Sequence, residues 1–355
     1  MSKQNSVTNE CARSLRILTF SMFVLLLASA TAGAQISRSA ASYLSRGNAS
    51  YTKGDLDAAI ADYDAAIAFD PGYPLAYLKR GDARQERADF EGALADYTKA
   101  IEINPRLSAA YNNRGNARQS MGDISGAIQD FNKAIEINPR SALAFYNRGN
   151  AKLHSGDLDG AQADFDAAIV NNPRSGEAYA NRASLLYKKG QTDKAIADCN
   201  KAISINPRIA DAYVNRGAAL SHKGQIDRAL NDFNIALSID PENAMAYQNR
   251  GAIKSARGDL EGANADYDRS IAINPRLSLA YLNRGLNRML QGKPAEADSD
   301  FEMCLKLEIG LKNLLEMHKR MVAEQIAQKE STIKGPSDRS KRLASEFESI
   351  IQFRL

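Results

Sequence analysis

Apolar and polar positions recur along most of the chain with a period of 34 residues. Each copy begins with an aromatic residue at that spacing: Tyr43, Tyr77, Tyr111, Phe145, Tyr179, Tyr213, Tyr247 and Tyr281. A second apolar pattern follows within the same copy, as at Ala127, Phe131, Ala134 and Ile135, which recur at helical intervals. Two short helices per copy are therefore predicted, and the predicted fold class is all-α.

Turn signals separate the two helices of each copy and end the second one. Gly122 and Asp123 supply a glycine after the first helix and an N-cap for the next. Prolines then end the second helices, at Pro71, Pro105, Pro139, Pro173, Pro207, Pro241 and Pro275. One such hairpin cannot bury its own apolar face, so the copies are expected to stack on one another.

This arrangement resembles the tetratricopeptide repeat, a helix–turn–helix unit of the same length. In the third copy the matching residues are Tyr111, Gly115, Gly122, Ala127, Phe131, Ala134 and Pro139. The resemblance implies eight repeats over residues 40–308, stacked as a right-handed superhelical α-solenoid. Residues 309–330 are expected to form a capping helix whose inner face carries Leu311, Leu314, Leu315, His318, Met321, Val322 and Ile326.

The chain departs from the family pattern at the third residue after each aromatic, where arginine replaces the usual leucine. An aspartate follows every such arginine sixteen residues later. An antiparallel hairpin brings the two to similar heights, which predicts part-buried ion pairs such as Arg114–Asp130, Arg148–Asp164 and Arg216–Asp232. The alternative is that unpaired arginines grip an anionic ligand in the groove.

Asparagine precedes the arginine in six consecutive copies, although it forms helices poorly. These residues are Asn113, Asn147, Asn181, Asn215, Asn249 and Asn283. The resemblance implies that this position faces the concave side, where the similar repeats of O-GlcNAc transferase hold a peptide backbone with an asparagine ladder. Further amides could widen the strip: Asn112, Asn116, Asn150 and Gln119. The alternative is that these asparagines serve local structure or solubility.

Binding rather than catalysis is the predicted function. The chain is expected to be a non-enzymatic adaptor or scaffold that holds an extended peptide or partner protein in the asparagine-lined groove. The alternative is a structural subunit of an envelope complex that uses its convex surface or C-terminal tail. No catalytic residue, metal site or cofactor is predicted, because the three histidines lack ligand spacing. The nearly neutral repeats argue against nucleic acid as a partner.

Both ends of the chain differ from the repeats. Residues 1–34 resemble a secretory signal peptide, with basic residues, an apolar run and the small residues Ala32-Gly33-Ala34. Export is therefore expected, to a bacterial periplasm or outside the cell; an uncleaved membrane anchor is the alternative. Residues 331–355 comprise a basic linker and an amphipathic segment with Leu343, Phe347, Ile350 and Ile351 aligned. That segment is expected either to fold back on the cap or to dock on a partner protein or membrane.

Overall fold

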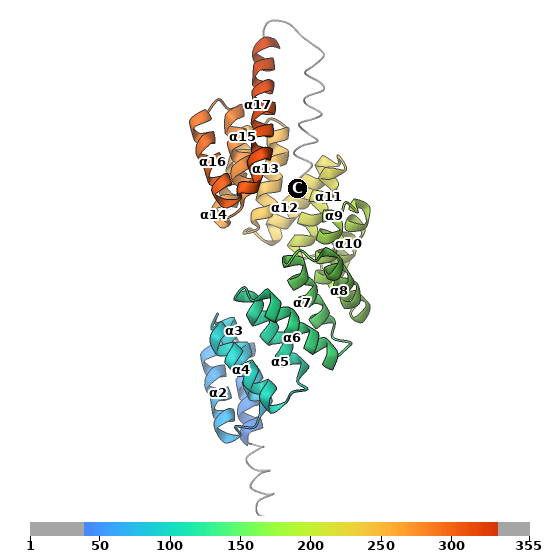
Figure 1. Cartoon of the computed structure of the whole chain (residues 1–355), viewed down its shortest axis with the longest axis vertical. Helices are drawn as coiled ribbons and strands as arrows, with labels where there is room; N and C mark the ends of the chain where they lie inside the picture. Colours follow the sequence, from blue (N-terminus) through green and yellow to red (C-terminus); the bar gives the residue numbers. More distant parts are fainter. Residues whose placement is uncertain (1–38, 333–355) are drawn as a thin grey trace, which may run out of the picture. The chain divides into compact units, whose positions relative to one another are not determined.

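The computed structural model describes residues 39–332, and every regular element in that range is helical. Two compact units can be distinguished, one ending at Asp164 and one beginning at Phe165. Figure 1 shows the helices in chain order. The predicted signal peptide, and the linker and amphipathic segment beyond Thr332, lie outside the described residues.

Unit 1 contains a helix at residues 39–52 and six further helices before α8. Their bounds are α2 (Leu56–Phe69), α3 (Pro74–Glu86), α4 (Phe90–Ile103), α5 (Ser108–Ser120), α6 (Ile124–Ile137) and α7 (Ala142–His154). The division between the units falls within α8 (Leu158–Asn171).

Unit 2 continues the pattern. Its helices are α9 (Gly176–Lys188), α10 (Thr192–Ile205), α11 (Ala210–His222), α12 (Ile226–Ile239), α13 (Ala244–Ala256), α14 (Leu260–Ile273), α15 (Ser278–Leu290) and α16 (Pro294–Leu307), followed by η1 (Ile309–Leu311) and α17 (Lys312–Thr332). Within both units first helices pack along the second helix of the same repeat, as α3 does on α4 and α9 on α10. The second helix then packs on the next repeat, as α4 does on α5. The prediction of an all-α solenoid is confirmed within each unit.

The turn inside each hairpin depends on a left-handed residue. Gly122 has a φ of 86°, and Asp123 then caps α6 by accepting a hydrogen bond from Gly126 N at 2.8 Å. Glycine adopts such a φ without the steric cost that a Cβ brings. The second repeat differs, because Ala88 holds the equivalent position with a φ of 60°.

Ala88→Gly is expected to stabilise the protein. The substitution removes the strain of a left-handed alanine but gives the unfolded chain more freedom, leaving a net gain of about 0.5–1 kcal/mol. Urea denaturation measures the change. Gly122→Ala is the matched control and should be destabilising; a loss of stability in Ala88→Gly would contradict the strain argument.

The second helix ends in a side-chain turn. Asn104 caps α4, and its Oδ1 accepts a hydrogen bond from Arg106 N at 3.0 Å. Pro105 lies between them and cannot continue the helix. The same turn follows α6, where Asn138 accepts from Arg140 N. Local sequence therefore fixes the exit from the hairpin before any packing is considered.

An aromatic ring packs against a glycine at the centre of most hairpins. A Cβ added at Gly115 would lie 2.6 Å from Phe131 Cε1, closer than two carbon atoms can approach. The same contact recurs at Gly47–Tyr63, Gly81–Tyr97, Gly217–Phe233, Gly251–Tyr267 and Gly285–Phe301. Glycine is therefore required because the second helix carries a ring at that height.

The fifth repeat changes both members of this contact. Ala183 stands in place of the glycine and Cys199 in place of the ring, and both are buried in one cluster with Leu186. The smaller cysteine leaves room for the alanine methyl. Burial raises the pKa of the Cys199 thiol to about 12, so the thiol is protonated at neutral pH.

The last helix covers the end of unit 2. Leu311, Leu315 and Val322 are buried in a cluster with Tyr281 and Phe301, and Leu314 and Ile326 pack at its edge. His318 is 8 % exposed on the same helix. The predicted apolar face thus packs on α15 and α16, and the helix continues to Thr332, two residues beyond the predicted end.

Candidate functional site

Each arginine of the repeat lies against the aspartate sixteen residues later. Arg114 donates from Nε and Nη2 to Asp130 Oδ2 and Oδ1, at 3.0 and 2.7 Å. The corresponding distances are 2.9 and 2.6 Å for Arg148–Asp164 and 2.8 and 2.8 Å for Arg216–Asp232. The other pairs are Arg46–Asp62, Arg80–Asp96, Arg182–Asp198, Arg250–Asp266 and Arg284–Asp300. Bidentate geometry at a nearly buried carboxylate makes these strong charge-assisted contacts.

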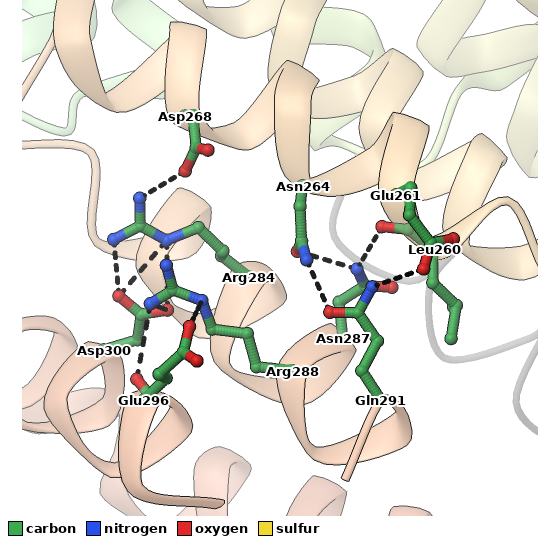
Figure 2. A network of polar contacts seen from close by, with 10 residues as sticks. All are labelled: Leu260, Glu261, Asn264, Asp268, Arg284, Asn287, Arg288, Gln291, Glu296 and Asp300. Carbon is green, nitrogen blue, oxygen red and sulfur yellow. Dashed lines mark hydrogen bonds and ion pairs between the residues drawn. The ribbon is translucent and has the colours of Figure 1, made fainter. Parts of the chain in front are cut away.

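The same arginine also reaches the preceding repeat. Arg216 Nη1 donates to Asn200 Oδ1 at 2.7 Å. Arg284 Nη1 donates to Asp268 Oδ1 at 2.6 Å, and Figure 2 draws this contact between Arg284 and Asp268. The partner is always the residue sixteen positions earlier: Asp64, Thr98, Asn132, Asp166, Asn200, Asn234 or Asp268. One side chain therefore joins two successive hairpins, and an anionic ligand would have to displace these partners.

A second cation, which the sequence analysis missed, shares the aspartate in five repeats. Arg118 Nη1 lies 2.7 Å from Asp130 Oδ2. The equivalent pairs are Arg84–Asp96, Lys152–Asp164, Lys254–Asp266 and Arg288–Asp300. The sequence does contain a pattern that predicts it, because in these five repeats a basic residue follows the arginine by four positions. The fifth and sixth repeats carry buried Leu186 and Leu220 there instead.

The asparagines of the predicted ladder are largely engaged within the chain. Asn113 donates to Asp82 Oδ1 at 2.7 Å, Asn147 to Asn112 Oδ1 at 2.9 Å, and Asn215 to the carbonyl of Ala180 at 3.1 Å. Asn181 and Asn283 are half-buried. These contacts join successive repeats, and binding of a peptide by this row stays a prediction.

Three of the predicted amides lie in the interior rather than on an open surface. Asn112, Asn147 and Asn249 are 4, 8 and 1 % exposed. Consecutive first helices pack against each other, as α5 does on α7 and α11 on α13, and cover this position. The described residues therefore do not form an uninterrupted, open ladder of amides.

A hollow of about 440 Å³ in unit 1 gathers four of the predicted amides. It will be called the unit 1 hollow, and its lining is Gln85, Asn116, Gln119, Ser120, Ile124, Asn147, Asn150 and His154. These residues come from the ends of α3, α5 and α7 and the start of α6. Asn116 and Gln119 are half-buried, whereas Asn147 is buried, with 8 % of its surface exposed.

A second hollow, of about 370 Å³, lies in unit 2. This unit 2 hollow is lined by Ser184, Tyr187, Lys188, Gly190, Thr192, Val214, Asn215, Ala218, His222, Met245 and Asn249. The rings of Tyr187 and His222 meet edge to face, with centroids 5.9 Å apart. Two ladder residues thus contribute here, beside a more apolar wall than in unit 1.

Comparison with known families decides the identity of the repeat. Profiles of the tetratricopeptide repeat match residues 47–87, 82–122, 108–141, 146–210 and 210–243, together more than half of the chain. The chain belongs to the tetratricopeptide repeat family. No curated protein sequence matches it closely.

Solved tetratricopeptide structures share the fold. A tetratricopeptide repeat protein from Parabacteroides merdae is 25 % identical, covers 70 % of this chain and 99 % of its own, and superposes with a TM-score of 0.56. PilF of Pseudomonas aeruginosa is 18 % identical over 60 % of this chain and 96 % of its own, with a TM-score of 0.55. The Cut9–Hcn1 hetero-tetramer of the APC/C is 15 % identical, covers 74 % of this chain and 52 % of its own, and superposes with a TM-score of 0.63. The last two likenesses concern the fold alone.

Tetratricopeptide repeats form extended binding surfaces for other proteins, and proteins built from them are in general non-enzymatic adaptors. Among residues 39–332 no cluster of three or more His, Cys, Asp or Glu side chains could hold a metal ion. The same residues include no helix with the length and apolar character needed to cross a membrane.

A buried amide network in the last two tetratricopeptide repeats was not foreseen. Asn287, which is 1 % exposed, accepts from Ser255 Oγ and donates to Asn264 Oδ1 and the Leu260 carbonyl, each at 2.7 Å. Asn264 donates onward to Gln291 (Figure 2). Every donor finds an acceptor on a neighbouring helix, so this network fixes how α13, α14 and α15 pack.

Proposed function

We propose that this protein is an adaptor that holds an extended polypeptide through its side-chain amides, with the unit 1 hollow as a principal contact. The observation that carries the proposal is the gathering of Asn116, Gln119, Asn147 and Asn150 around one hollow. A structural subunit that uses its convex surface is the competing function.

Two of these amides have unused hydrogen-bonding capacity. Among the described residues, the side chains of Asn116 and Gln119 have no hydrogen-bond partner, and both are half-buried at the hollow. A carboxamide offers both donors and an acceptor, as a peptide group does. Asn116 and Gln119 can therefore pair with a main-chain N–H and C=O whatever the ligand's sequence.

The charge of the hollow favours the same class of ligand. Its lining contains no carboxylate, lysine or arginine, and the one titratable residue is His154. The arginines of the repeat are bound to aspartates, as at Arg114–Asp130. A neutral peptide backbone fits such a site better than a phosphate or a charged cofactor, which would lose hydration without gaining a counter-charge.

We also propose that the partner is met outside the cytoplasm. This rests on the resemblance of residues 1–34 to a signal peptide. Fusing those residues to a reporter that matures only after export tests it, and retention of the reporter in the cytoplasm would contradict it.

The Asn116→Ala/Gln119→Ala double variant tests the proposed site. Random peptides are displayed and selected against the wild-type chain, and the selected peptides are then measured against the variant. Loss of two amide pairings, each about 1 kcal/mol, should raise Kd about tenfold or more. Neither side chain bonds to another residue in the described range 39–332, so the urea midpoint should stay near that of the wild type.

The matched control is Gln129→Ala, which removes an exposed amide from α6 outside the hollow. It should leave Kd unchanged. Equal Kd values for the double variant, the control and the wild type would rule out the unit 1 hollow. Asn147→Ala and Asn249→Ala are poorer tests, because both residues are buried and their loss would also disturb packing.

A further inference from the structure

The unit 2 hollow differs chemically from its counterpart in unit 1. Tyr187, Val214, Ala218 and Met245 give it an apolar wall, and Met245 is 43 % exposed. Its basic lining residues are Lys188 and His222, and none of its lining residues is a carboxylate. Such a site fits a large apolar side chain flanked by acidic residues.

One segment of this chain carries that combination. The stretch LASEFESII at residues 343–351 places Phe347 between Glu346 and Glu348, followed by Ile350 and Ile351. The sequence just before it is basic, at Arg339, Lys341 and Arg342. The segment therefore places acidic and apolar side chains next to one another, the combination that suits the hollow.

The chain between α17 and this segment is long enough to reach the hollow. α17 packs on α15, α15 on α13, and α13 on α11, and the last two of these helices line the hollow. Neighbouring axes lie about 8–10 Å apart. Phe347 comes fifteen positions after Thr332, a span of up to about 50 Å when extended.

We infer that residues 343–351 occupy the unit 2 hollow of the same molecule. Phe347 packs on the wall formed by Tyr187, Val214 and Met245, and Glu346 and Glu348 lie beside Lys188 and His222. The segment thereby covers Asn215 and Asn249. Its regulatory consequence, competition with a peptide partner, rests on the proposed function; the occupancy itself does not.

Tethering makes a weak contact sufficient. A short flexible linker gives an effective concentration on the order of millimolar. A segment with an intrinsic Kd of about 0.1 mM would then occupy the hollow about nine-tenths of the time and protect a lining residue about tenfold.

Thiol labelling in the full-length chain tests this occupancy. Ser184 lines the hollow, and Ser204 is exposed on α10 outside it. With Cys11→Ser as background, Ser184→Cys and Ser204→Cys are labelled with a bulky maleimide; the native Cys199 and Cys304 are buried. Ser184 is half-buried and Ser204 exposed, so each position is compared with itself. Phe347→Asp/Ile350→Asp should speed the labelling of Ser184→Cys about tenfold and leave that of Ser204→Cys unchanged.

Charge-reversal variants provide a second test of the proposed occupancy. Lys188→Glu should speed the labelling of Ser184→Cys, and Glu346→Lys/Glu348→Lys added to it should slow the labelling again. A labelling rate of Ser184→Cys that the tail variants leave unchanged would overturn the inference. Protection that disappears on dilution would assign the segment to a second copy and overturn occupancy within one molecule. None of these results depends on a foreign peptide, so the function proposed for the unit 1 hollow stands or falls separately.

Discussion

Arg216→Leu is expected to lower the free energy of unfolding by about 3–4 kcal/mol, because it leaves a buried carboxylate without its counter-charge. The side chain of Asp232 is 3 % exposed, and among the described residues Arg216 is its only cation. Leu220 occupies the position from which a second cation approaches in other repeats. The substitution also removes the hydrogen bond from Arg216 to Asn200 of the preceding repeat. Urea denaturation followed by circular dichroism measures the loss.

The chain supplies its own matched comparison. Arg114→Leu removes the same contact in the third repeat, but Arg118 remains 2.7 Å from Asp130. The expected cost there is about 1–2 kcal/mol, since the carboxylate keeps one charged partner. The Arg216→Leu/Asp232→Leu double variant should regain most of the loss, because an apolar pair replaces a buried ion pair at little cost. Equal losses for Arg216→Leu and Arg114→Leu would show that the second cation is unimportant.

Cys199→Phe is expected to destabilise the protein by about 2–3 kcal/mol through overpacking. The sixth repeat shows the geometry: a Cβ added at Gly217 would lie 2.7 Å from Phe233 Cε1. A ring at position 199 would meet the methyl group of Ala183 at a similar distance. Thermal and urea denaturation of the single variant measure this cost.

Ala183→Gly should relieve the clash. The Ala183→Gly/Cys199→Phe variant reproduces the pair at Gly217 and Phe233, which already coexists with the buried Leu220. Alone, Ala183→Gly should cost about 1 kcal/mol as a helix-interior glycine. The two substitutions should therefore couple favourably by about 2 kcal/mol. Simple additivity would contradict the steric fit between the side chains at positions 183 and 199.

The repeat and its ion pairs could be predicted from the sequence because both depend on spacing. A period of 34 residues fixes the hairpin, and the interval of sixteen residues between Arg114 and Asp130 places them at one height across it. The second cation has a spacing of its own, twelve residues between Arg118 and Asp130, and could have been found in the same way. Contacts with the preceding repeat, such as Arg216 with Asn200, needed the stacking as well.

The binding surface was harder to predict, for a physical reason. A sequence position defines the direction in which a side chain leaves its helix, but the distance between stacked helices decides whether water can reach it. Asn147 and Asn116 both lie on first helices. Asn147 is 8 % exposed and bonded to Asn112, whereas Asn116 is half-buried and bonds to no side chain or backbone group of residues 39–332.

The sequence by itself determined the all-α fold, the repeat family, the turns and the pairing of charges within a hairpin. These follow from interactions between residues fewer than 34 positions apart, which the periodic pattern records directly. Only the tertiary structure decided which amides remain available, and that a neutral hollow forms in unit 1 and a more apolar one in unit 2. Burial and cavity shape depend on how three successive first helices approach one another, and no single repeat contains that information.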